Sequence, residues 1–584
     1  MLLAPDTTGG TLTLTGGTIL PFILTDGGIL ELGDANTGTV YINALGSISS
    51  TTADTLLLQT NTSSATAQVN ETGSLGVGTL VVDTGGAFDI GGAVNAGSVN
   101  LVANTVTETS PGSLVGAGTL SGLVTNGLML NNGSNNVADI ESLSAGTLAL
   151  DDGANALAVT GSVNADSIDL IANALSETGV GSIVGGGTLT GSIANLATLA
   201  GGNTIGTLGD FIAGTLVLAN SGTLDISGTV SATASASITT GGSLTIPGTI
   251  ASPLITLQGS GIDTTGTVIA GTLTGTATAG SAQFTGSNMI STLGAFSADG
   301  LTLDDAANLS VSGTVNGGTS AVVLNDGTFN LTLATASEVQ AGSVTLIGEA
   351  LALDGAVNAG SIDLVGTTSV TEATTASLAG TLSGTGATLT GAVGTLAALQ
   401  GENTIAVLGD FSAGTLQLND PGSALKIAGV VNAGSIDFQG SSVAEVSGGT
   451  LAGVVTLTGS LSQDAAFGNA NTVGTLGAFT AGGNFELDDG EGLTVAGVVS
   501  AGTGDSLTLR TDSLTLSGGG SLVANNGTVA IAPETAGAAM TVGSALGGSI
   551  DTGTSGTLAL GTTLTGDITL NSLGSVAATL ALYT

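Results

Sequence analysis

The feature that most constrains this chain is an apolar–polar–apolar triplet that recurs roughly every 20 residues. The triplet at 224–226 (LDI) returns at 244–246 (LTI), and the triplet at 344–346 (VTL) returns at 362–364 (IDL). This alternation is typical of a β-strand with one buried face. Gly, Asn, Asp and Ser, which turn a chain, flank the triplets. The period therefore predicts very short strands joined by tight turns.

Strands of three or four residues are stable only when each one stacks on its copy from the neighbouring coil. The chain has 99 glycines in 584 residues, which makes long helices improbable. We therefore predict an all-β fold, a single-chain parallel β-solenoid (β-helix) with about 19–20 residues per coil. At ~20 residues per coil the chain would form roughly 29 coils. We expect one continuous solenoid over residues 1–584, without a separable globular domain.

A longer repeat of about 68 residues contains the short one, and it is clearest at 136–250 and 403–500. The first half of this long repeat, Asn-Thr-Ile-Gly-Thr-Leu-Gly-Asp-Phe at 203–211, returns at 403–411 and 471–479 in slightly changed form. Its second half is Val-Asn-Ala-Gly-Ser, which begins at Val94, Val357 and Val431. The phenylalanines at one fixed place of the repeat either fill a wide corner of the core, as we expect, or stack on a ligand: Phe211, Phe296, Phe411 and Phe479.

The charge balance excludes several classes of function. Lys426 and Arg510 are the only basic side chains against 43 acidic ones, and Cys and His do not occur. Disulfides, Cys/His zinc sites and catalysis by His or Cys are therefore impossible. Nucleic-acid binding needs cations that the chain lacks, and so does attraction to an anionic membrane. No unbroken apolar run reaches the length of a membrane-spanning helix, so we expect no membrane insertion.

Paired carboxylates follow several strands and are the only candidate ligands for a metal. Calcium takes oxygen ligands from such turns, but the known loop patterns of calcium-binding proteins are missing here. We interpret these residues as turn formers, with weak calcium binding as the alternative. We predict no other cofactor and no catalytic residue. The calcium candidates are Asp151, Asp152, Asp304, Asp305, Glu486, Asp488, Asp489 and Glu491.

Over about residues 70 to 520 the Gly-Thr-Leu-x-Leu and Val-Asn-Ala-Gly-Ser elements make the chain similar to a known family. It resembles the repeat region of filamentous-haemagglutinin-like and autotransporter passenger proteins of Gram-negative bacteria. The resemblance implies a right-handed coil, secretion to the cell surface, and an adhesive or structural role. The amino-terminal secretion module and the carboxy-terminal membrane barrel of such proteins are not found in this sequence.

We therefore expect a non-enzymatic extracellular or cell-surface protein, namely a self-assembling fibre or surface-layer subunit. Its partner would be a second copy, joined end to end through open solenoid edges. No charged cap interrupts the strand pattern at either end, which favours this filament. The alternative is an adhesin stalk that binds a cell-surface or matrix polysaccharide or protein. With two basic residues in all, trypsin-like proteases have only two cleavage positions, which suits an extracellular protein.

Two remote alternatives have specific requirements. An ice-binding solenoid needs ranks of outward Thr on one face, whereas the outward position of the triplets varies: Val217, Asp225, Thr245, Gln417, Lys426 and Asp437. A polysaccharide-active β-helix needs cations to hold an acidic sugar, and Lys426 and Arg510 are separated by about four coils.

The alternation also predicts that Leu244→Asp, with its side chain inward, destabilises far more than Thr245→Asp, which we expect to be nearly silent.

Overall fold

The computed structural model describes residues 1–14, 28–43, 48–49, 54–60, 65–70, 73–380, 386–545, 548–563, 565–571 and 579–583. Over these residues the chain forms strands and turns but no helix. The strands pair in parallel and form a β-solenoid of the right-handed type with about 25 turns. The predicted all-β parallel solenoid is therefore confirmed.

The chain divides into two compact units, and each is described by itself. The single continuous solenoid over 1–584 stays a prediction. The strands of the first unit are β1 (Leu2–Leu3), β2 (Thr11–Leu14), β3 (Ile29–Leu32), β4 (Thr39–Ile42), β5 (Ile48–Ser49), β6 (Thr55–Gln59), β7 (Thr66–Val69), β8 (Ser74–Asp83), β9 (Ala87–Ile90), β10 (Ala93–Glu108), β11 (Ser113–Val115), β12 (Ala117–Leu130), β13 (Val137–Asp151), β14 (Ala156–Val159), β15 (Ser162–Ala172), β16 (Ala174–Glu177), β17 (Ser182–Val184), β18 (Thr188–Asn203), β19 (Thr207–Asn220), β20 (Leu224–Ile226), β21 (Thr229–Thr240), β22 (Leu244–Ile246), β23 (Thr249–Gly259), β24 (Ile262–Thr264) and β25 (Thr267–Ala277).

Strand β26 (Ala282–Ser297) contributes residues to both units. The strands of the second unit are β27 (Leu301–Asp305), β28 (Leu309–Val311), β29 (Thr314–Asn316), β30 (Ala321–Asn325), β31 (Leu331–Leu333), β32 (Glu338–Leu353), β33 (Ala356–Glu372), β34 (Ser377–Ala379), β35 (Ala387–Val393), β36 (Leu396–Leu399), β37 (Ile405–Ile427), β38 (Val430–Glu445), β39 (Thr450–Ala452), β40 (Val454–Leu461), β41 (Ala465–Asn471), β42 (Val473–Ala481), β43 (Phe485–Asp489), β44 (Gly492–Val495), β45 (Val498–Ser500), β46 (Ser506–Arg510), β47 (Ser513–Ser517), β48 (Ser521–Val523), β49 (Thr528–Ala532), β50 (Met540–Ala545), β51 (Ser549–Asp551), β52 (Thr557–Leu560), β53 (Ile568–Asn571) and β54 (Thr579–Leu582).

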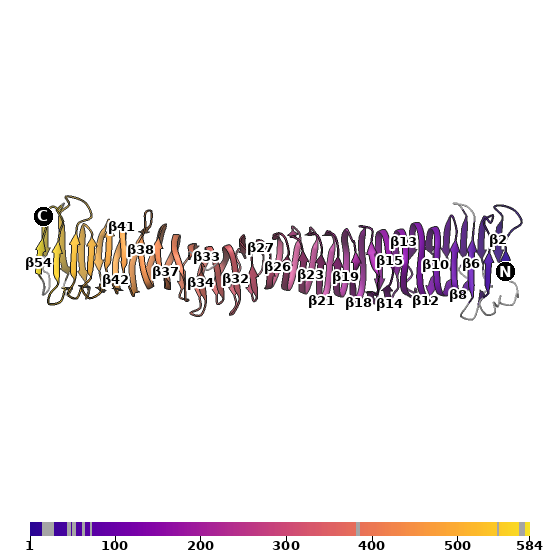
Figure 1. The fold of residues 1–584 in the computed structure, drawn as a ribbon, viewed down its shortest axis with the longest axis horizontal. Coiled ribbons are helices and arrows are strands. Elements are labelled where there is room, and N and C mark those ends of the chain that lie inside the picture. Colours follow the sequence, from indigo (N-terminus) through magenta and orange to yellow (C-terminus); the bar gives the residue numbers. More distant parts are fainter. Residues whose placement is uncertain are drawn as a thin grey trace. The chain divides into compact units, whose positions relative to one another are not determined.

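The triplets form strands because each apolar pair finds its copy in the next coil. Strand β22 shows the pattern: Leu244 and Ile246 are fully buried, and Thr245 between them points outward. Leu244 pairs with Leu224 of the coil before and with Ile262 of the coil after. Figure 1 shows β19, β21 and β23 of successive coils side by side. The inward register predicted for Leu244 is therefore confirmed.

The coils are less uniform in length than the short period predicts. Near the end of the first unit Thr229 pairs with Thr249, and Thr249 pairs with Thr267, which is close to the expected spacing. Near the start of that unit Thr11 pairs with Thr39, and in the second unit Thr528 pairs with Thr557, so these coils are clearly longer. The paired strands keep their register across these longer coils. The turns therefore number about 25 rather than roughly 29.

The long repeat moves around the solenoid by one side per repeat. In the first unit Val94 and Leu101 lie seven residues apart in one coil. The next repeat places Val163 on the column of Leu101, through the pairs Leu101–Gly122, Gly122–Leu143 and Leu143–Val163. The reason is arithmetic, because ~68 residues are roughly three and one third coils of ~20 residues.

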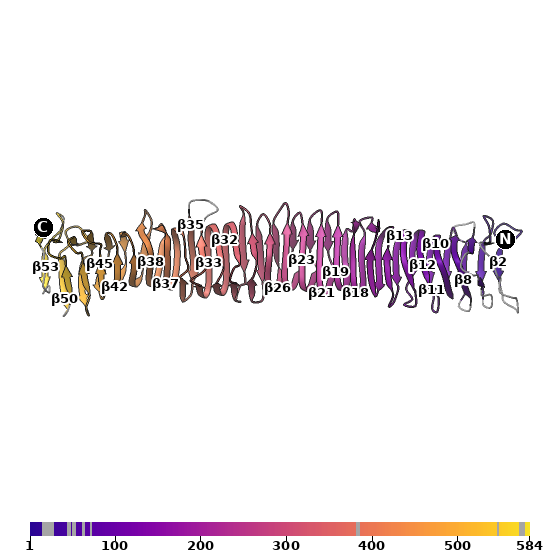
Figure 2. The same ribbon diagram turned by 60° about the horizontal axis from the view of Figure 1, so that its bottom comes forward.

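The second unit repeats the same shift. Val357 and Leu364 again lie seven residues apart in one coil, and Val431 lies on the column of Leu364. Phe438, seven residues after Val431, shares its column with Val499 of the following repeat. Figure 2 shows the strands of these coils, among them β33, β37, β38 and β42. A feature that occurs once per repeat therefore changes side between these copies.

The phenylalanines of the repeat are core residues. Phe211, Phe296, Phe411 and Phe479 are at most 2% exposed, which confirms the expected role in filling the core. Three of them pair with a glycine of the coil before, at Gly191, Gly391 and Gly459. A Cβ atom at Gly459 would lie 2.6 Å from Cε2 of Phe479, so the glycine provides the space for the ring. In the second unit Phe438, Phe467, Phe479 and Phe485 form an aromatic cluster with ring centroids 5.1 to 6.3 Å apart.

Candidate functional site

The first two predicted acid pairs are split between the surface and the core. Asp151 is half-buried and accepts the N–H of Gly153 at 2.9 Å, whereas Asp152 is fully buried and accepts the N–H of Val137 at 2.6 Å. Consecutive residues of a strand point to opposite faces, so a pair at its end cannot hold one ion from one side.

The second pair behaves in the same way. Asp304 accepts the side-chain amide of Asn325 at 2.9 Å, and the buried Asp305 accepts the N–H groups of Ile290 and Ala307. These carboxylates bind their own backbone and neighbouring amides, as expected of turn and core residues.

The densest acidic cluster is also dispersed. Asp488 and Asp489 are both buried, Glu486 is half-buried and Glu491 is exposed. Asp488 forms an ion pair with Arg510 at 3.1 Å, and Asp489 accepts the N–H of Val473 at 2.8 Å. Among the residues that the structure describes, no group of three or more acidic side chains comes together in a way that could hold a metal ion. Weak calcium binding by these residues stays a prediction.

An asparagine at or directly before the start of the long repeat is the centre of a buried polar unit that the sequence analysis missed. Asn135, Asn203, Asn403 and Asn471 are at most 1% exposed. Each side-chain oxygen accepts a backbone N–H from the coil before, at 2.7 Å in all four cases. Each side-chain NH2 group donates to a backbone carbonyl of the coil after, at 3.0 to 3.2 Å. The amide therefore joins three successive coils.

A glutamate from the coil before completes each unit. Glu108, Glu177, Glu372 and Glu445 accept the NH2 group of the asparagine with Oε2, at 2.9 to 3.2 Å. The same oxygen accepts a backbone N–H, at 2.6 to 3.0 Å. The other oxygen, Oε1, is buried in all four and has no hydrogen-bond partner. One side of each carboxyl group is thus well bonded and the other is not.

The coil after the asparagine contributes a third buried side chain, either Asp or Asn. Asp152, Asn220, Asp420 and Asp489 occupy this place and accept the backbone N–H two residues after the asparagine, at 2.6 to 3.1 Å. Asn220 also donates with its NH2 group to the carbonyls of Ile205 and Thr223, both at 3.1 Å. An aspartate at this place can donate only when it is protonated.

Burial favours the protonated form of these carboxyl groups. It raises the pKa of Asp152, Asp420 and Asp489 to about 6 and that of Glu445 to about 7, although hydrogen bonds from N–H groups act in the opposite direction. The pKa of Glu108, Glu177 and Glu372 is raised for the same reason. These carboxyl groups are thus shifted toward the protonated form, and they bridge the coils by hydrogen bonds.

The sequence does contain a signal for these units. Each glutamate is the last residue of its strand and ends a stretch of the form Thr-Val-Thr-Glu, Ala-Leu-Ser-Glu, Ser-Val-Thr-Glu or Ser-Val-Ala-Glu. The asparagine follows between one and two coils later in the sequence. A glutamate at an inward position is recognisable from the alternation. What alternation alone does not show is which asparagine of the following coil is its partner.

On the outer surface, threonine hydroxyl groups donate hydrogen bonds to several of the aspartates. Thr245 donates to Asp225 of the coil before at 2.7 Å, and it pairs with Asp263 of the coil after. Thr190 and Thr458 donate in the same way to Asp169 and Asp437. The expectation that Thr245→Asp is nearly silent therefore needs correction, because a carboxylate at 245 would stack between two others.

Two surface hollows have polar linings. One, with an empty volume of about 530 Å³, is lined by Thr374, Gln400, Gln417, Leu418, Asn419, Asp437 and Gln439. Gln400 donates to Gln417 at 2.8 Å, and Gln439 to Asp437 at 3.1 Å. The other, of about 670 Å³, lies beside Arg510, with Glu534 and Thr535 in its lining. Amides and hydroxyls of this kind can bind the hydroxyl groups of a sugar.

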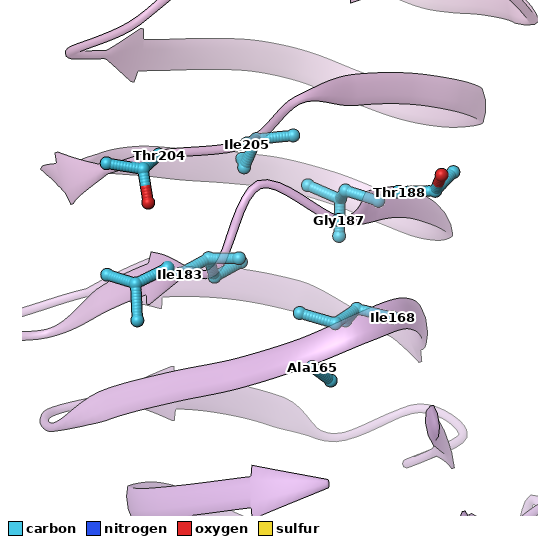
Figure 3. Close-up of a pocket in the computed structure, with 9 residues that line it drawn as sticks. Ala165, Ile168, Ile183, Gly187, Thr188, Thr204 and Ile205 are labelled. Atoms are coloured by element: carbon cyan, nitrogen blue, oxygen red, sulfur yellow. The ribbon is translucent and has the colours of Figure 1, made fainter. Parts of the chain in front are cut away.

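The interior offers no comparable space at the gap between the coils of β15, β17 and β18. Ile168, Ile183 and Ile205 line this gap, which is too small for a water molecule (Figure 3).

Among the described residues, no helical segment has the length and apolar character needed to cross a membrane. In comparisons with known proteins, no family model, no curated protein and no solved structure matches the chain.

Proposed function

We propose that this chain is a non-enzymatic structural protein of the cell exterior, a subunit of a fibre or surface layer built from a stiff β-solenoid. The observation that carries the proposal is the shift of the long repeat by one side per repeat. A feature that occurs once per repeat is then presented all around the coil. Such a distribution suits a scaffold better than a one-sided active site.

The buried polar units support the same proposal. Their carboxyl groups accept N–H groups in the core, so they fix the register of neighbouring coils. A register fixed at each of these units stiffens the solenoid locally. An extracellular location is in keeping with the presence of only two basic residues, Lys426 and Arg510.

The partner that we propose is a second copy of the chain, joined end to end. Each described coil binds the next through parallel main-chain hydrogen bonds, and the edge of a second copy can continue the same pattern. Electron microscopy of the purified chain over a concentration series tests this. We expect filaments whose length grows with concentration, and single particles at every concentration would contradict the proposal.

The second candidate is an adhesin stalk with a resemblance to autotransporter passengers. The amide-lined hollow beside Gln400, Gln417 and Gln439 favours it, because it is a place where a neutral polysaccharide can bind. A glycan array probed with the wild-type chain and with Gln417→Ala tests this candidate. Binding that is lost in the variant supports the stalk, and an array without signal contradicts it.

A further inference from the structure

One side of the first unit carries no charge over five successive coils. Its outward side chains come from β18, β19, β21, β23 and β25 and are Leu196, Thr198, Thr215, Val217, Ala219, Ser235, Ser237, Thr239, Leu254, Thr256, Gln258, Thr272, Thr274 and Thr276. We call this set the neutral face. The residues between them in each strand, such as Leu216 and Ile238, are buried.

The neutral face is regular as well as uncharged. The column Thr198, Val217, Ser237, Thr256 and Thr274 is continuous in the strand register. The register shifts of these strands lie outside it, at the corner before Thr215 and Ser235 and after Leu199. Within residues 188–276 the charged side chains are Asp210, Asp225 and Asp263, and all three lie on the other sides.

We propose that the neutral face packs against the same face of a second copy, with the two solenoids antiparallel. The charge balance supports a second copy as the occupant. Two chains that each carry a net charge of −41 repel each other wherever their carboxylates meet. On this face a second copy can approach without bringing any two carboxylates together.

The order of large and small side chains supports the antiparallel arrangement. A two-fold axis along the middle strand, β21, places the coil before β21 opposite the coil after it in the partner. Leu254 then faces Thr215, and Leu196 faces Thr272. Every leucine of the face therefore lies opposite a threonine, and Ser237 lies on the axis opposite its own copy.

The area indicates a weak contact. Five strands at ~4.8 Å spacing and about five residues at ~3.3 Å each give roughly 400 Å² per copy. A standard interface buries about twice that area per partner. We therefore expect the pair to form at high protein concentration. In a fibre the same contact would be strengthened, because neighbouring copies are already held close together. Only this second expectation rests on the proposed function.

Sedimentation equilibrium on the purified chain tests the pair independently of fibres. Ser237→Asp places two carboxylates against each other on the axis, whereas its neighbours Val217 and Thr256 within one chain are uncharged. The matched control is Ser231→Asp, an outward serine of the same strand that lies outside the neutral face. We expect dimer formation by the wild type and the control, and at least ~10-fold weaker association of Ser237→Asp, with unchanged circular dichroism in both variants.

Cysteine cross-linking tests the orientation, since the natural chain has no cysteine. Ser237→Cys should form an intermolecular disulfide under oxidising conditions, and Val217→Cys alone should not. A mixture of Val217→Cys and Thr256→Cys chains should cross-link, because these positions face each other. A wild type that stays monomeric, a Ser237→Asp variant that associates like the wild type, or self-cross-linking of Val217→Cys would each overturn the proposal. Filaments without lateral pairs would overturn it while leaving the proposed function intact.

Discussion

At the scale of single residues, the buried aspartates differ from the asparagine that occupies the same place in another repeat. Asn220 donates with its amide group to the carbonyls of Ile205 and Thr223. Asp489 lies at the matching place, and its Oδ2 is buried without a hydrogen-bond partner. Ionised, this oxygen has no proton to donate to carbonyls that the amide group of Asn220 can reach. Asn220 therefore shows how an uncharged side chain is bonded at the place that Asp489 occupies in its own repeat.

We predict that Asp489→Asn stabilises the folded chain at neutral pH. Burial raises the pKa of Asp489 from 3.8 to about 6, so the ionised form is disfavoured in the fold. Removing that cost should raise the free energy of unfolding by on the order of 2–3 kcal/mol at pH 7.5 and by almost nothing at pH 4. Denaturant unfolding at the two pH values measures the difference. Equal effects at both pH values would mean that the fold does not raise the pKa of Asp489.

Asp512 is the matched control with the opposite sign. Hydrogen bonds from the N–H and hydroxyl groups of Thr535 hold its pKa below the usual value. Its stabilising effect is present above the unfolded pKa and is lost as the pH falls through the lower folded value. We expect Asp512→Asn to destabilise the chain slightly at pH 7.5, and a gain there would contradict the assignment.

At the scale of the strand, alternation decides which substitutions are tolerated. Ile238 of β21 is fully buried, and its neighbour Thr239 points outward between Ala219 and Gln258. We predict that Ile238→Asp costs several kcal/mol of stability, because it leaves a carboxylate unpaired in the core. Thr239→Asp should change stability by less than ~0.5 kcal/mol. Thermal unfolding of both variants compares them, and similar losses would place the register one residue off.

The glycine–phenylalanine pairs make a second prediction at this scale. Gly459→Ala brings a methyl group within 2.6 Å of the Phe479 ring and within 2.7 Å of the carbonyl of Phe438. Overpacking of this kind costs about 1–3 kcal/mol. Phe479→Leu leaves room for the methyl group, so the double variant should lose less than the sum of the two single losses. Strict additivity in a double-mutant cycle would show that the ring and the glycine do not share one space.

The elements also show what the sequence could and could not predict. Leu244 and Thr245 were assigned correctly because a period of two needs only local information. The long spacing between Thr11 and its partner Thr39 was not predicted, since alternation within a strand does not depend on the length of the coil. Asn203 was noticed as a repeat marker, but its partners Glu177 and Ile183 lie in the coil before. Contacts between coils depend on register, which a sequence without aligned relatives specifies only loosely.

At the scale of the whole molecule, the raised pKa values add up to one pH dependence. Burial raises the pKa of Asp152, Asp305, Asp420, Asp488 and Asp489 to about 6, and that of Asp326 and Glu445 to about 7. The folded chain then binds more protons than the unfolded chain between about pH 4 and pH 7. Stability should be greatest near pH 4 and fall as the pH rises to 7. A thermal midpoint that increases over this interval would contradict the raised pKa values.

The acids on the surface govern how the molecules associate beyond a pair. With 43 acids and two basic residues, larger bundles must bring charged sides together, whereas end-to-end contacts join main-chain groups. We predict that added salt promotes bundling strongly and end-to-end growth much less. Calcium and magnesium should act at similar concentrations, because no group of three acids in the described parts of the chain forms a metal site. Light scattering and microscopy over a calcium series, with magnesium and sodium at matched ionic strength, measure both effects. If calcium acts far below magnesium and Asp304→Asn abolishes the difference, the paired aspartates are ligands rather than turn formers.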